Sequence, residues 1–160
     1  MRFMNVKLDM KNTGSSSYSV KGKTYKEVFD ALSKRKHQGL YTWNTGVSYK
    51  MDGDKNIIDI KLSHTSDIEM PKWPGYSSAP KEDKAKWDNM FHTLLCHEQK
   101  HHTLAAKTLK AWAKTLTAAK QMDKKTFDAW HGKESKAHTA AQVAFDKKTK
   151  HGTDDASCRP

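Results

Sequence analysis

The first part of the chain has the alternating pattern of strands. Residues 4–10 carry apolar side chains at every second position, and 12–17 are rich in Gly and Ser, which predicts a strand and then a loop. A Thr-x-x-Glu spacing predicts a short helix over 25–36. The segments 40–50 and 56–64 flank an Asp-Gly turn signal and are rich in strand-forming residues, so we expect a hairpin there.

The second part of the chain changes to a helical period. A third extended piece at 68–70 leads into a proline-rich loop over 71–80. Apolar positions then recur every three or four residues, which predicts a long helix over 81–119 and, after a break, a second helix over 126–148. The pattern predicts an α+β fold in which an N-terminal antiparallel sheet with a short helix packs on two C-terminal helices.

Length and composition narrow the class of protein. A chain of 160 residues fits one domain, which we expect over 1–152, with a C-terminal tail at 153–160. Two cysteines exclude a disulfide-dense scaffold and four-cysteine zinc modules. No apolar run is long enough to span a membrane. The N-terminus lacks the apolar segment of a signal peptide, which keeps a cytoplasmic protein or a delivered effector among the expectations.

The formal net charge of +11 favours an acidic partner. Lysine carries most of this charge, whereas specific readout of nucleic acid relies on arginine, so we expect no specific nucleic-acid partner. Anionic polymers of the cell envelope, or a non-enzymatic basic binding module, remain compatible with the charge.

The candidate metal-binding and catalytic residues lie in the first predicted long helix. His97 and His101 are four residues apart, so on a helix both rings project from one face and can bind one Zn²⁺ ion. Glu98 lies beside them, where its carboxylate can take a proton from water and deliver it to a leaving amine. This is the H-E-x-x-H pattern of zinc peptidases.

A catalytic zinc site needs a third protein ligand. The metzincin continuation is excluded, because Leu104 and Lys107 stand where it needs Gly and His or Asp. The remaining candidates near the second helix are Glu134, Asp146 and His151.

The sequence resembles the DUF922 family of bacterial proteins, predicted to be secreted zinc-dependent proteases. The resemblance rests on the segments 18–24, 70–73, 97–101 and 145–152, the last reading Phe-Asp-Lys-Lys-Thr-Lys-His-Gly. It implies a zincin-like domain with a functional end to the second helix. Phe145 departs from the tyrosine of the family pattern, which removes a phenol donor.

With this resemblance we rank His151 first as third ligand, because it follows the helix end and is free to swing inward. Asp146 ranks next, and otherwise holds an imidazole N–H, and Glu134 is the third candidate. If His151 lies beside His97, Cys158 is close enough to form a disulfide with Cys96; otherwise Cys96 is a buried thiol.

The expected function is therefore a zinc-dependent metallopeptidase with Glu98 as general base. Its partner is a peptide or protein substrate, which pairs with an edge strand near 68–70. The alternatives are a zinc amidase acting on cell-wall peptide, or the basic binding module. The resemblance implies a secreted or cell-envelope location.

Overall fold

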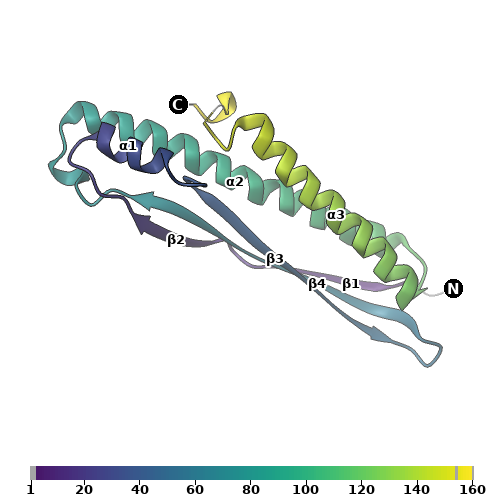
Figure 1. Cartoon of the computed structure of the whole chain (residues 1–160). Coiled ribbons are helices and arrows are strands. Elements are labelled where there is room, and N and C mark those ends of the chain that lie inside the picture. The colour runs from purple at the N-terminus through teal and green to yellow at the C-terminus, as the bar shows by residue number, and fades with distance from the viewer. Residues whose placement is uncertain (1–2, 154, 160) are drawn as a thin grey trace. The chain divides into compact units, whose positions relative to one another are not determined.

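The computed structural model describes residues 3–153 and 155–159, and its α+β class confirms the prediction (Figure 1). The helices are α1 (Tyr25–Ser33), α2 (Lys81–Ala118) and α3 (Lys124–Thr149). The strands are β1 (Asn5–Met10), β2 (Gly14–Ser19), β3 (Leu40–Met51), β4 (Asn56–Lys72) and β5 (Met122–Asp123). Short 3₁₀ turns occupy Tyr76–Ser78 and Ala156–Cys158.

The chain divides into two compact units, each assembled from three separate stretches. Unit 1 contains the residues up to Asn12, Trp43–Ser66 and His102–Ala144. Unit 2 contains Thr13–Thr42, Asp67–His101 and the residues from Phe145 onward.

The prediction of an antiparallel sheet is wrong, because β1 and β2 both run parallel to β4. In unit 1, β1 pairs with β4 in the register Val6↔Ile60. In unit 2, β2 pairs with β4 in the register Ser15↔Ile68, so the predicted Gly/Ser loop is a strand. Alternating polarity marks a strand but carries no information about its distant partner, and β2 lacks even that alternation because its side chains are nearly all exposed.

The hairpin prediction is confirmed, since β3 and β4 pair and a tight turn joins them. The Asp52 backbone N–H donates to the Asn56 carbonyl at 2.9 Å, and the Asp52 carboxylate accepts from the Asn56 N–H at 2.9 Å. Lys55 takes the left-handed backbone conformation, with φ of 64°. A second antiparallel partner, β5, pairs with β4 at the start of that strand.

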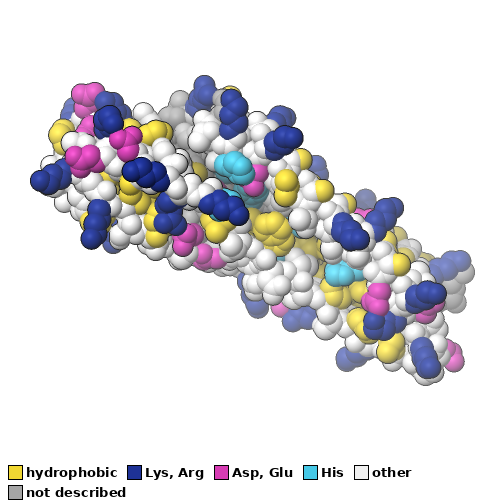
Figure 2. Space-filling model, viewed as in Figure 1, with side chains coloured by type: hydrophobic (Ala, Val, Ile, Leu, Met, Phe, Trp, Pro, Cys, Tyr) yellow, Lys and Arg dark blue, Asp and Glu magenta, His cyan; other side chains and the backbone are white. Residues whose placement is uncertain are grey.

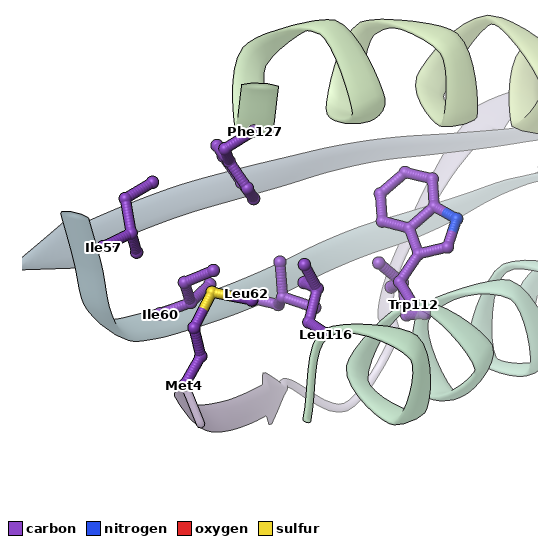
Figure 3. Packing of buried hydrophobic residues seen from close by; sticks show 8 residues of the cluster. Met4, Ile57, Ile60, Leu62, Trp112, Leu116 and Phe127 are labelled. Atoms are coloured by element: carbon purple, nitrogen blue, oxygen red, sulfur yellow. The ribbon is translucent and has the colours of Figure 1, made fainter. Parts of the chain in front are cut away.

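The core of unit 1 lies between the strands and the helical segments of that unit (Figure 3). Ile57, Ile60 and Leu62 project from β4, and Met4 precedes β1. Helices α2 and α3 contribute the large buried side chains Leu109, Trp112, Leu116 and Phe127. Burial of these apolar surfaces is the main stabilising contribution in unit 1.

Two histidines are buried in unit 1 outside the predicted site. His64 is fully buried on β4, and His138 on α3 is 6% exposed. Burial lowers the pKa of both imidazoles, and for His64 the neighbouring His102 and His138 lower the pKa further. The ring of His138 packs edge-on against Trp43 and Trp112, and neither of its nitrogens has a hydrogen-bond partner among the described residues.

We expect His138→Phe to make the protein less sensitive to acid. A histidine whose folded-state pKa is depressed favours folding above its unfolded-state pKa of about 6.5, and this contribution is lost as the pH falls. Urea unfolding at about pH 8 and about pH 5 should show a smaller loss of stability for the variant than for the wild type. Equal losses in the two proteins would mean that protonation of His138 is not coupled to unfolding.

In unit 2, α1 and the first turns of α2 lie side by side (Figure 1). The predicted capping-box residues cap the helix: Thr24 accepts from the Glu27 N–H, and Glu27 accepts at 2.8 Å from the N–H of Lys23, one residue before Thr24. The Tyr25 N–H donates to Asp83 on α2 at 3.0 Å. The hydrophobic core of unit 2 is a cluster of buried side chains that includes Val20, Val28, Leu32, Trp73 and Trp87. These contacts anchor the segment of α2 that leads into the predicted site.

No helix among the described residues has the length and apolar character needed to cross a membrane.

Candidate metal centre

The central part of α2 brings the three motif residues together inside unit 2. His97 is fully buried, and Glu98 and His101 are each 4% exposed. The two Nε2 atoms lie 3.2 Å apart. One donor atom from each of the three side chains, including a Glu98 carboxylate oxygen, lies within 4.8 Å of the others. The helical spacing therefore produces the cluster that the sequence predicts.

Asp146, on the last turn of α3, completes a triangle of donor atoms. Its Oδ1 lies 3.1 Å from His97 Nε2 and 2.9 Å from His101 Nε2. Tetrahedral zinc with bonds of about 2.0–2.1 Å places neighbouring donors about 3.3 Å apart. Two imidazole nitrogens and a carboxylate oxygen at these separations fit a zinc ion, both in spacing and in donor chemistry.

The ring of His97 is oriented by the end of α3. The Thr149 hydroxyl donates to the Phe145 carbonyl at 2.8 Å and lies 3.3 Å from His97 Nδ1. Because the hydroxyl proton is already used, Nδ1 is the donor to Thr149, which leaves the lone pair on Nε2 for a metal. The Phe145 ring stacks on the imidazole at 4.8 Å.

The backbone of Gly152 packs closely against the His97 side chain. Its φ is +86°, and an added Cβ would lie 2.9 Å from His97 Cγ. Only glycine combines this backbone conformation with this close approach. The His-Gly pair at the end of the family motif is thus explained by its glycine, which lets the backbone lie against the imidazole.

Burial and charge set the protonation of the site. The pKa of Glu98 is raised to about 7. Burial is the largest cause, and the nearby Asp146 carboxylate also raises the pKa. His101 and a hydrogen bond from the Tyr41 N–H act in the opposite direction. Burial lowers the pKa of His97, and His101 lowers it further, against the opposing effect of Asp146 and Asp155. Near neutral pH His97 is therefore uncharged, as a metal ligand must be.

The other two ligand candidates lie in different environments. His151 follows α3 with φ of 54°, its side chain is 62% exposed, and its Nδ1 lies 3.6 Å from Asp146 Oδ1. Glu134 is half-buried on the part of α3 that belongs to unit 1, whereas the donor triangle belongs to unit 2. Of the three candidates, Asp146 is the one whose carboxylate oxygen lies within 3.1 Å of the Nε2 atoms of both motif histidines.

A disulfide between Cys96 and Cys158 attaches the C-terminal segment to the motif helix. Lys100 adds an ion pair with the buried Asp155, with N–O distances of 3.0 and 3.1 Å. Burial alone would raise the pKa of Asp155, but Ser157 and Lys100 hold it below its usual value. The sequence left open either this disulfide or a buried Cys96 thiol, and the structure contains the disulfide.

We expect Cys158→Ser to destabilise the protein by about 2–4 kcal/mol, because the disulfide restricts the unfolded chain over a long loop. The two cysteines are 62 residues apart. Urea unfolding of the variant and of the wild type, each with and without a reducing agent, measures the effect. Reduction should destabilise the wild type by a similar amount and leave the variant unchanged; a reduction-sensitive variant would contradict this explanation.

A family model described as a bacterial protein of unknown function, DUF922, matches residues 15–152. The chain belongs to the DUF922 family. The resemblance predicted from the sequence is thereby confirmed. We found no match among curated proteins or among solved structures.

The match includes His97, Glu98, His101 and Asp146. It ends at Gly152, before Cys158 of the disulfide.

In this DUF922 protein, sequence reasoning missed Tyr41 and Asp155. Tyr41 donates its backbone N–H to Glu98 and stacks its ring on His101 at 5.9 Å. No local pattern marks a backbone donor from a distant strand, whereas for Asp155 the available signal was its position three residues before Cys158.

Proposed function

We propose that this DUF922 protein is a zincin-like, zinc-dependent metallopeptidase, in which Glu98 is the general base. The observation that carries the proposal is the triangle of His97 Nε2, His101 Nε2 and Asp146 Oδ1, with edges of 2.9–3.2 Å. In this proposal Asp146 is the third ligand, and His151 takes the adjacent exposed position.

The residues of the site suit hydrolysis by water. Bound zinc would polarise a substrate carbonyl and lower the pKa of water. Glu98, whose pKa burial raises to about 7, is suited to accept a proton from the attacking water and then donate it to the leaving amine. The Tyr41 N–H holds the Glu98 carboxylate in place during both transfers. Phe145 and Tyr41 cover the two imidazoles with aromatic rings, which limits access of bulk water.

The start of β3 is the best-placed strand to bind an extended peptide. The predicted edge near 68–70 is covered on one side, because β2 pairs with that part of β4. Among the described strands β3 pairs with β4 alone, and it begins at Leu40, next to the Tyr41 contact with Glu98. A peptide paired with the first residues of β3 would place its carbonyl groups beside the catalytic carboxylate.

The disulfide supports the proposal of a secreted or cell-envelope enzyme, because disulfides persist in oxidising compartments. Figure 2 shows Lys and Arg side chains spread over the visible face, with acidic side chains among them. A dispersed cationic surface suits contact with an anionic envelope polymer better than a defined nucleic-acid path.

The proposal is tested with protein purified without a histidine tag. We expect close to one zinc per chain by mass spectrometry, cleavage of casein, and loss of cleavage on chelation that zinc restores. Purified peptidoglycan, digested in parallel, distinguishes a peptidase from an amidase of cell-wall peptide. Protein that takes up no zinc on reconstitution would exclude both enzymes and favour the basic binding module.

A further inference from the structure

Unit 2 contains a cavity of about 500 Å³ on the N-terminal side of the motif. Its walls come from α1, from the part of α2 before the motif, and from the C-terminal segment. We call it the α1–α2 pocket. Its lining includes Tyr25, Phe29, Lys86, Met90, Thr93, Leu94 and Arg159.

Residues that line the α1–α2 pocket adjoin the candidate metal centre. Leu94 lines the pocket and lies one helical turn before Glu98. Gly152 also lines the pocket, and its backbone lies against His97. A third wall residue, Gln38, adjoins Gly39, where an added Cβ would lie 2.9 Å from Glu98 Oε1. A substrate residue bound at the catalytic carboxylate would therefore have this cavity beside it.

The lining of the pocket determines which side chain fits. Tyr25, Phe29, Met90 and Leu94 form its apolar surface, and Phe29 is 40% exposed in a protein whose other large apolar side chains are mostly covered. None of the described lining residues is acidic. Two are basic: Lys86, which pairs with Glu82 outside the lining at 2.7 Å, and Arg159.

We propose that the α1–α2 pocket binds a large apolar side chain, such as Leu, Met or Phe, of the substrate residue next to the scissile bond, and excludes Lys and Arg. This inference rests on the proposed peptidase function. A pocket of this size has room for an aromatic side chain, and apolar walls favour its transfer from water. A basic side chain would find no carboxylate in the lining and would meet Arg159.

The size preference is tested with peptides that differ only in one residue X beside the cleaved bond, with X as Phe, Leu, Ala or Lys. The wild type should cleave the Phe and Leu peptides about tenfold or more faster, in kcat/KM, than the Ala peptide. Thr93→Phe should remove this preference, because Thr93 lines the cavity and, among the described residues, its hydroxyl bonds only within its own helix, to the Asn89 carbonyl.

Thr117→Phe is the matched control. Thr117 lies on the same helix, donates to the Ala113 carbonyl in the same way, and belongs to unit 1. It should keep the wild-type preference. Cleavage by Thr93→Phe with the wild-type preference would overturn the proposal.

The charge preference is tested with Lys86→Glu, compared with Lys110→Glu, which makes the same charge change on α2 in unit 1. Lys86→Glu should raise cleavage of the Lys peptide about tenfold, whereas Lys110→Glu should not. An unchanged ratio between the Lys and Phe peptides in Lys86→Glu would contradict the exclusion of basic side chains.

Binding to Glu98→Gln separates this inference from the proposed function. The zinc-loaded variant should bind the Phe peptide more tightly than the Ala or Lys peptide, and addition of Thr93→Phe should remove the difference. If the wild type cleaves no peptide but this binding pattern holds, the pocket is supported and the peptidase function fails. Equal binding of all peptides by Glu98→Gln would overturn the pocket, whatever the wild type cleaves.

Discussion

Glu98→Gln is expected to abolish most of the hydrolytic activity while zinc content stays at the wild-type level. Loss of a general acid–base group lowers kcat by roughly 10²–10⁴-fold. The amide has the size of the carboxylate and still accepts the hydrogen bond that Tyr41 donates. It cannot accept a proton from water, so the variant removes the proton transfer without opening a cavity.

The pH dependence of stability in the metal-free protein shows whether Glu98→Gln acts by removing the ionisable carboxyl group. Burial raises the pKa of Glu98 from 4.5 to about 7, so the neutral acid favours the folded state. That contribution is complete below the unfolded-state pKa and is lost as the pH rises through about 7. Metal-free wild type should therefore lose stability over this range relative to Glu98→Gln. Full activity in a variant free of wild-type contamination would refute the role of Glu98.

The local features of the fold were predictable from the sequence because their causes are local. The capping box before α1, the turn at Asp52 and the two long helices each depend on residues within a few positions of one another. The HExxH cluster was predictable for the same reason. A helix places residues i and i+4 on one face wherever it forms.

The parallel pairing of β1 and β2 with β4 was not predictable, because it joins segments that are distant along the chain. Ser15, for example, pairs with Ile68, which lies 53 residues further along the chain. A run of exposed serines has the composition of a loop, and its strand conformation comes from the neighbouring strand. The same limit applies to Tyr41, whose backbone N–H reaches Glu98.

The choice among third ligands shows where sequence reasoning ends. Asp146 and His151 both stand in the final motif, and both are chemically competent ligands. The last turn of α3 carries Asp146 to 2.9 Å from His101 Nε2, whereas the left-handed backbone at His151 leaves that side chain 62% exposed. The distinction depends on where a helix ends in space, which residue types and spacing do not specify.

Asp146→Ala is therefore expected to abolish tight zinc binding, whereas His151→Ala should retain it. Loss of one of three protein ligands should lower zinc affinity by more than the roughly 10–100-fold typical of an outer hydrogen-bonding partner. Competition with a chromogenic zinc chelator measures the affinity, and mass spectrometry of the purified proteins measures the metal content. Asp146→Asn, which keeps one oxygen but loses the charge, should bind zinc with intermediate affinity.

The comparison of the two alanine variants decides between the ligands, provided that both fold. Circular dichroism of the metal-free proteins checks this, and Asp146→Ala should fold, because the Asp146 side chain is 30% exposed and its buried neighbour His97 is uncharged near neutral pH. Zinc retained by Asp146→Ala but lost from His151→Ala would make His151 the ligand, as the family motif alone suggested. In that case the His151 side chain would have to turn from solvent toward the two motif histidines on metal binding, since it is now 62% exposed.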